Sequence, residues 1–213
     1  CRMDLLIVAA TKFEIAPFLA TNSTADVLIT GVGIPATIFN LNKKLTELKY
    51  DLVIQAGIAG TFNETFEKSE VSIIKDDTFA DIGVDEKGNF KTLFELGFAD
   101  ENEFPYSSGW LTNDEESLKK VQLPLVKAIT VNKITDDKSQ LKKLVEKFHA
   151  DIESMEGAAF HYVCLQQKVN FLQLRSISNV VGERNKTKWK MEEAISFLNI
   201  ELQKLIENFR YLL

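Results

Sequence analysis

Two glutamates lie at predicted strand ends, where a carboxylate can meet a ligand. Glu156 lies in DIESMEGAAF, in which residues 152–155 are predicted to form a strand tip and residues 157–160 the start of a helix. The small residues beside it leave room for a ligand, and a helix N-terminus favours an ionised carboxylate, so Glu156 is suited to bind the hydroxyls of a sugar. It could instead only cap its own helix, a role also open to Glu153. Glu14 lies just past the first apolar run, in VAATKFEIAP.

Glycine-rich turns follow two further predicted strands. In VLITGVGIPA, Gly31, Gly33 and Ala36 have the G-x-G-x-x-A spacing of a dinucleotide-binding turn. That motif normally follows the first strand and needs an acidic residue at the next strand tip, where this chain has Gln55 and then glycine. A nicotinamide cofactor is therefore disfavoured. Because a second turn, QAGIAG at 55–60, follows the next strand, the pair indicates a crevice where backbone N–H groups approach a ligand, although tight turns alone would also use glycine.

A third strand end carries an amide and then a run of cations. The apolar run at 171–177 predicts a buried strand, which delivers Ser178 and Asn179 at its tip. The segment that follows combines four cations with one aromatic residue: Arg184, Lys186, Lys188, Trp189 and Lys190. These cations gain nothing from the N-terminus of the helix that comes next, since its dipole favours acids. Solvation is the interpretation for the three lysines, and a ligand contact is the interpretation for the arginine.

The composition disfavours several classes of protein. The 213 residues suffice for one domain with a sizeable core, and we expect a single domain over 1–213. A net charge of −6 argues against nucleic acid as a partner, because phosphate binding needs a broad basic face, and no apolar run approaches a membrane span. Cys1 and Cys164 form no disulfide framework, and His149 and His161 are too far apart for a metal site. We expect a cytoplasmic protein without metal or membrane partner.

Short apolar strands alternate with amphipathic helices along the chain. Strands are predicted at 4–10, 25–30, 50–57, 71–77 and 171–177, and helices at 34–48, 137–148, 156–167 and 190–212. Thr135 and Asp136 are the expected caps of the second helix. Between 78 and 113 the pattern loosens, and hairpins and a loop are expected there. This alternation predicts an α/β sandwich with a mixed sheet.

These motifs, in this order, resemble the purine nucleoside phosphorylase/nucleosidase superfamily over nearly the whole chain. The segments TGVG, AGIAG, ESMEGAAF and RSISN have counterparts in its nucleosidases, and the tail VVGERNKTKW is similar to its futalosine hydrolases, which act in menaquinone biosynthesis. The resemblance implies a three-layer α/β/α sandwich around a mixed, partly barrel-like central sheet. It also implies a homodimer whose partner supplies an aromatic side chain to the pocket, and we expect that contact in the region of Phe79, Phe98, Phe104 and Tyr106.

The resemblance assigns roles to residues by their positions in these motifs. Glu14 corresponds to the glutamate that orients and deprotonates the attacking water, and Glu156 to the glutamate that accepts hydrogen bonds from the ribose hydroxyls. Met155 corresponds to a methionine that packs under the sugar. The other substrate-binding candidates lie in the two glycine turns: Gly33, Ile58, Ala59 and Gly60. Water is the nucleophile, and no cofactor is implied.

Asn179 departs from the adenine-specific nucleosidases, which have an aspartate at its position. A 6-oxopurine presents two acceptors, N7 and O6, whereas adenine presents an acceptor beside a donor. An asparagine amide offers N–H donors to both acceptors, so Asn179 favours hypoxanthine or guanine as the leaving base. Futalosine also carries a benzoate on the far side of its ribose. Arg184 is the expected partner of that benzoate, because a planar guanidinium matches a carboxylate.

Hydrolysis of a purine nucleoside, with futalosine as substrate, is thus the predicted activity, and three alternatives stay open. A purine nucleoside phosphorylase would need a phosphate pocket. Neither glycine turn contains an arginine, and Ile58 stands where a serine or threonine would be useful, but Arg175 keeps that alternative open. An adenosylhomocysteine-type nucleosidase would fit Asn179 poorly. A nucleoside-binding module without turnover would have little use for Glu14.

Overall fold

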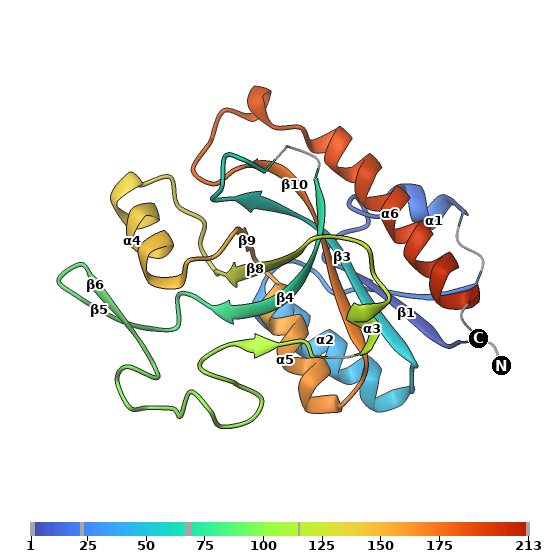
Figure 1. Ribbon diagram of the computed structural model, residues 1–213, viewed down its shortest axis with the longest axis horizontal. Helices are drawn as coiled ribbons and strands as arrows, with labels where there is room; N and C mark the ends of the chain where they lie inside the picture. Colours follow the sequence, from blue (N-terminus) through green and yellow to red (C-terminus); the bar gives the residue numbers. More distant parts are fainter. Residues whose placement is uncertain (1–2, 22–23, 67–69, 115, 212–213) are drawn as a thin grey trace.

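The central sheet closes on itself at one side (Figure 1). The computed structural model describes residues 3–21, 24–66, 70–114 and 116–211. Strand β10 pairs with both β3 and β4, and β8 and β9 complete a ring in the order β3–β10–β4–β8–β9. The ring strands are β3 (Leu52–Thr61), β4 (Val71–Phe79), β8 (Leu125–Thr130), β9 (Ile152–Ser154) and β10 (Phe171–Val180). β1 (Leu5–Ala9) and β2 (Asp26–Ile29) extend the sheet beyond β3, and β7 (Leu111–Thr112) pairs with β4.

The sheet is mixed, as expected, and its parallel part sets the position of the site. β2, β1, β3 and β10 are neighbours that run parallel, whereas β10–β4, β3–β9 and β4–β7 are antiparallel pairs. The carboxyl ends of the parallel strands therefore meet at one edge. In open α/β sheets this is the edge where ligands bind.

Helices cover both faces of the sheet and make the three layers that the resemblance implied. α2 (Ile34–Glu47) and α5 (Gly157–Gln167) pack together on one face, and α1 (Ala16–Thr21) and α6 (Met191–Tyr211) lie on the other (Figure 1). Each face buries its own apolar cluster against the sheet. A third cluster joins strands of the ring: Ala59, Ile74, Val126, Ala128, Ile152 and Ile177. The predicted fold, with its partly barrel-like sheet, is confirmed.

Most predicted elements are present, and three details differ. β8 and the short helices α1 and α3 (Glu116–Lys119) were not predicted. β10 continues past residue 177 to Val180, through an irregularity in its register with β3. α4 (Lys138–Phe148) is capped by Asp137, whose side chain accepts a hydrogen bond from the Gln140 N–H at 2.8 Å, so the expected caps Thr135 and Asp136 were wrong.

The segment between β4 and β7 holds the expected hairpin. β5 (Gly83–Glu86) and β6 (Asn89–Thr92) pair as a separate antiparallel sheet. Cys164 is a free, buried thiol on α5, and Cys1 lies outside the described residues. In the described part of the chain, no helix has the length and apolar character needed to cross a membrane.

Candidate active site

A cavity of about 340 Å³ opens at the carboxyl ends of the parallel strands. Its lining includes residues at or just after the ends of β1, β3, β9 and β10, together with the segment between β10 and α6. Eight of the nine predicted site residues line it: Glu14, Ile58, Ala59, Gly60, Met155, Glu156, Asn179 and Arg184. The ninth, Gly33, contacts the cavity indirectly, because its N–H donates to a carboxylate oxygen of Glu156.

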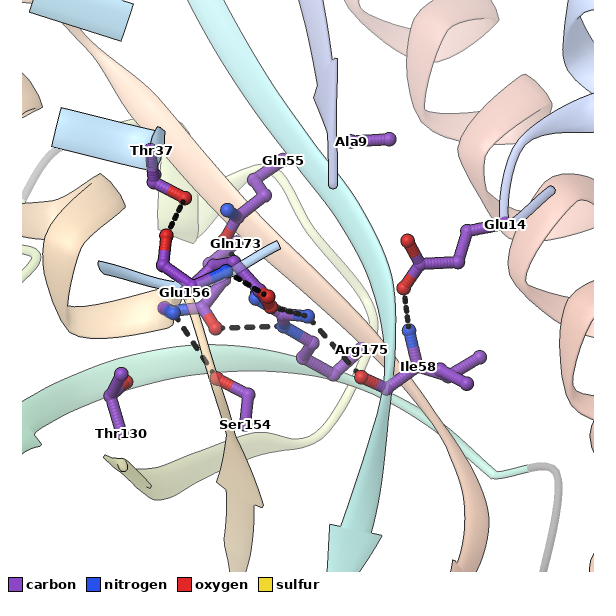
Figure 2. Close-up of polar contacts among 12 residues, drawn as sticks. Ala9, Glu14, Thr37, Gln55, Ile58, Thr130, Ser154, Glu156, Gln173 and Arg175 are labelled. Carbon is purple, nitrogen blue, oxygen red and sulfur yellow. Dashed lines mark hydrogen bonds and ion pairs between the residues drawn. The ribbon is translucent and has the colours of Figure 1, made fainter. Parts of the chain in front are cut away.

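Glu14 is held by three donors in the turn after β1. Its Oε2 accepts hydrogen bonds from the Thr11 N–H at 3.1 Å and from the Thr11 hydroxyl at 2.9 Å. Its Oε1 accepts from the Ile58 N–H of β3 at 3.2 Å, as Figure 2 shows. The side chain is only 7% exposed. A carboxylate has about four acceptor positions, so a fixed Glu14 can still accept a hydrogen bond from a water molecule in the cavity.

Glu156 occupies the N-cap position of α5 but does not cap it. The Ser154 hydroxyl accepts from the Gly157 N–H at 3.1 Å, so Ser154 holds the helix start, and neither Glu156 nor Glu153 has the alternative capping role. The Glu156 carboxylate instead crosses to the Gly33 N–H at 3.0 Å. Gly33 has φ 94°, a conformation that favours glycine. Burial raises the pKa of Glu156, whereas Arg175 and the Gly33 N–H act to lower it.

Arg175 is buried beside the site and links residues of β3 and β10 through hydrogen bonds. It is 1% exposed and donates to Gln173 Oε1, to Gln55 Oε1 and to the Ile58 carbonyl at 3.0, 2.9 and 3.2 Å. Its Nη1 lies 3.8 Å from Glu156 Oε2. Figure 2 shows Glu14 and Arg175 on opposite sides of Ile58, each bonded to its backbone. Each nitrogen of the guanidinium therefore donates within the protein, and Arg175 is absent from the described lining of the cavity.

A buried polar chain continues from Arg175 away from the cavity. Gln173 donates to Asp77 Oδ2 at 3.0 Å, and the Thr130 hydroxyl donates to Asp77 Oδ1 at 2.9 Å. Burial raises the pKa of Asp77 to about 6, although these two hydrogen bonds oppose the shift. A Cβ on Gly157 would collide with both Asp77 and Gln173. Because Gly157 at the start of α5 has no side chain, Asp77 and Gln173 can pack against this end of the helix.

Asn179 lies at the end of β10 with a fixed amide. Its Oδ1 accepts from the Ser178 hydroxyl at 2.8 Å, and its Nδ2 donates to the Val180 carbonyl at 2.9 Å. An amide nitrogen carries two hydrogens, so one N–H stays available for a ligand in the cavity. From the sequence we expected two Asn179 N–H donors for N7 and O6, but one of them is used by the Val180 carbonyl.

The four cations that follow β10 are all exposed, and Arg184 is the one of them that lines the cavity. Arg184 and Trp189 line the cavity, and the Trp189 indole N–H donates to the Glu183 carbonyl at 2.7 Å. Lys188 pairs with Glu183 at 3.0 Å and Lys190 with Glu193 at 3.2 Å, and all three lysines are exposed. No described partner pairs with Arg184, which is the one cation among the described residues of the lining.

Several lining residues were missed or misread from the sequence. Thr11 pairs reciprocally with Glu14 in the sequence TKFE, and this T-x-x-E spacing is a known signal of such a pair. Glu153 lines the cavity and was considered only as a helix cap. Ile134 and Thr135 reach the lining from the loop before α4, and the sequence gives no signal for that contact. In the described part of the chain, no group of three or more His, Cys, Asp or Glu side chains could hold a metal ion.

Comparison with known proteins identifies the family. Residues 8–210 match the family described as the phosphorylase superfamily. The chain belongs to this superfamily. Two superfamily relatives are named futalosine hydrolase. The one from Thermus thermophilus is 27% identical and is aligned over 94% of each chain; the one from Streptomyces coelicolor is 27% identical over 73% of this chain and 65% of its own length.

Solved structures show the same superfamily fold. A mutant 5′-methylthioadenosine/S-adenosylhomocysteine nucleosidase of Helicobacter pylori, with 5′-methylthioadenosine in its active site, superposes with a TM-score of 0.80. The match covers 97% of this chain and 99% of that one at 16% identity. At this level of identity the likeness concerns the fold.

Proposed function

We propose that the chain hydrolyses the N-glycosidic bond of futalosine, releasing hypoxanthine and dehypoxanthine futalosine, as a cytoplasmic step of menaquinone biosynthesis. The observation that carries the proposal is that Glu14, Glu156 and Asn179 line one cavity. The two relatives named futalosine hydrolase support the choice of substrate. An amide at the base end, where a 6-oxopurine needs a donor, supports hypoxanthine as the leaving base.

In the proposed mechanism, the sugar–base bond breaks before the water attack is complete. The electron pair of the C1′–N9 bond goes to the purine and leaves an oxocarbenium-like ribose, as in glycoside hydrolysis generally. Glu156 accepts hydrogen bonds from the ribose hydroxyls, and Met155 packs under the ring. Asn179 donates to the departing base. Glu14 then takes the proton of a water whose oxygen bonds to C1′, a role that requires a carboxylate within hydrogen-bond reach. Glu14 releases this proton to solvent and the departing purine anion takes one from solvent, so hypoxanthine leaves as the neutral base.

The environment of Arg175 favours hydrolysis over phosphorolysis. This arginine is 1% exposed, is bonded to Gln55, Gln173 and Ile58, and is absent from the described lining, so it does not present its guanidinium to a ligand in the cavity. Besides Glu153 and Glu183, the latter paired with Lys188, the described lining carries the carboxylates of Glu14 and Glu156 and the single guanidinium of Arg184. A phosphate dianion would meet net repulsion there.

The function is tested by comparing substrates with and without phosphate. Base release from futalosine, inosine and methylthioadenosine is followed at equal concentrations in phosphate-free buffer and again with added phosphate. We expect the highest kcat/KM with futalosine and no acceleration by phosphate. A strict requirement for phosphate would favour the phosphorylase, and a preference for methylthioadenosine would favour the adenine-specific nucleosidase.

The first variant prediction concerns the base. Asn179→Asp should lower kcat/KM for hypoxanthine release relative to adenine release, because a carboxylate offers no N–H to N7 or O6, whereas its protonated form can donate to N7 and accept from the adenine amino group. Loss of such a hydrogen bond costs about 1–3 kcal/mol. The measurement is the ratio of kcat/KM for matched 6-oxo and 6-amino nucleosides. An unchanged ratio would show that Asn179 does not discriminate between the two bases.

A second variant prediction concerns the benzoate. Arg184→Ala should raise KM for futalosine by about tenfold, as expected for a lost charge-assisted hydrogen bond, and leave inosine cleavage nearly unchanged, since inosine lacks the carboxylate. Lys186→Ala is the matched control, because Lys186 is an exposed cation outside the described lining. Equal losses on both substrates would point to a structural role for Arg184.

We also propose a homodimer. Phe98 and Phe104, in the region expected to meet a partner, are 73% and 57% exposed, and exposed aromatic side chains are enriched at protein interfaces. Sedimentation equilibrium measures the assembly directly, and a monomer at micromolar concentration would contradict the proposal.

A further inference from the structure

Glu153 is a buried carboxyl group at the cavity that the proposed mechanism does not use. It is 5% exposed, and it lines the cavity from β9. Its Oε2 is buried and has no hydrogen-bond partner among the residues that the structure describes. A buried polar atom without a partner costs about 1–3 kcal/mol, so such groups in folded proteins call for an explanation, and a ligand is one.

Strand register places Glu153 across a glycine from Asn179. In the β3–β9 pair Gly60 lies opposite Glu153, and in the β3–β10 pair Gly60 lies opposite Asn179. Directly opposed residues point to the same face of a sheet. A Cβ on Gly60 would lie 2.9 Å from Val181 Cγ2 and 3.5 Å from Asn179 Nδ2, so the amide lies on that face with Val181 beside it. The two polar side chains thus flank a position without a side chain, about 10 Å apart at their backbones, or two strand spacings.

The surroundings of Glu153 favour its neutral form. Burial raises the pKa of Glu153 to about 7, and the negative charge of Asp81, in the segment after β4, acts in the same direction. Asp81 itself accepts hydrogen bonds from the backbone and side-chain N–H groups of Asn132. A neutral carboxyl group has one O–H donor and one carbonyl acceptor side by side.

The O–H and C=O of a neutral Glu153 carboxyl can supply the hydrogen bonds to a ligand that Asn179 cannot. Asn179 has one free N–H, because its Oδ1 is bonded to Ser178 and its second N–H to Val180. A 6-oxopurine has two acceptors on this side, N7 and O6, and beside O6 a donor, N1–H. One amide N–H therefore leaves an acceptor and a donor of the base unmatched. The O–H and C=O of a neutral carboxyl match O6 and N1–H.

We propose that Glu153, as a neutral carboxyl, binds the O6 and N1–H edge of the purine across Gly60 from Asn179. The inference rests on the proposed function, since it assumes a 6-oxopurine as leaving base. The O–H of Glu153 donates to O6, where negative charge develops as the base departs, and its C=O accepts from N1–H. A bound base would lie between Glu153 and Asn179, in contact with Val181, which also lines the cavity.

The test measures binding of hypoxanthine and 1-methylhypoxanthine by calorimetry. The methyl group replaces the N1 hydrogen, so the wild-type protein should bind 1-methylhypoxanthine about tenfold or more weakly. Glu153→Gln should keep tight hypoxanthine binding, because the amide N–H and C=O also match O6 and N1–H. Glu153→Met, of similar length but without polar atoms, should bind hypoxanthine about tenfold or more weakly and lose most of the preference over the methylated base.

Stability separates this role from a structural one. Because Oε2 has no described partner, Glu153→Met should unfold at a higher temperature than the wild type while binding hypoxanthine less well. A destabilised or unfolded Glu153→Met protein would overturn the inference, since it would reveal a structural partner. Equal wild-type affinities for the two bases, or unchanged binding in Glu153→Met, would also overturn it. Failure of the wild type to bind hypoxanthine at all would instead count against the proposed function.

Discussion

Glu14→Gln is expected to lower kcat for futalosine by about 10²–10⁴-fold, the usual contribution of a general base. Glutamine keeps the size and position of the side chain but cannot take a proton from water. Hypoxanthine binding should change little, because the amide of Asn179 and not Glu14 meets the base. Single-turnover measurements with excess enzyme isolate the chemical step from product release.

The matched control for this variant is Glu183→Gln. Glu183 is another carboxylate of the cavity lining, but it pairs with Lys188, 3.0 Å away. We expect its kcat to stay close to wild type. Circular dichroism and thermal unfolding confirm that both variants are folded. Near-normal turnover in a folded Glu14→Gln protein would remove Glu14 from the mechanism.

Gly57→Ala is expected to be strongly destabilising, although it adds only one methyl group. A Cβ at this position would collide with Arg175 Nη1, and it would lie 3.3 Å from Arg175 Cζ and 3.1 Å from Glu14 Oε1. The guanidinium would have to shift away from the Ile58 carbonyl and from Gln55. Overpacking and disruption of a buried charge together should cost about 3 kcal/mol of the free energy of unfolding, measured by urea denaturation.

A double-mutant cycle tests the cause of that loss. Arg175→Met removes the guanidinium that the new methyl group would meet. Residues that share one contact give non-additive effects, so Gly57→Ala should cost far less in the Arg175→Met background than in the wild type. Additive losses would show that the collision with Arg175 is not the cause.

The individual strands and helices could be predicted from the sequence more completely than the closure of the sheet into a ring. The runs at 52–57 and 171–177 are short, buried and mostly apolar, so their strands could be predicted. β8 was missed because its sequence LVKAIT is interrupted by Lys127 and begins with the exposed Leu125. The pairing of β10 with both β3 and β4 joins segments about 100 residues apart, and no local pattern carries that information. The barrel-like sheet was expected only from the family resemblance.

The residues of the candidate site could likewise be predicted from the sequence only in part. Glu14, Glu156 and Asn179 could be picked out because each lies at a predicted strand end, and the structure brings them to one cavity. Arg175 was misread as a possible phosphate ligand, since its buried partners Gln55 and Gln173 come from two strands that pair only in the fold. Glu153 was misread for a similar reason: its relation to Asn179 runs through Gly60, on a strand between them.

The most direct test of hydrolysis at this site is a single turnover of futalosine in oxygen-18-labelled water, with phosphate present. The products are analysed by mass spectrometry. If Glu14 activates water, the sugar product should carry one labelled oxygen at C1′ and no phosphate, hypoxanthine should be released in equal amount, and Glu14→Gln should form neither product at a comparable rate. A sugar 1-phosphate without label, or futalosine left intact by the folded wild-type protein, would contradict the account.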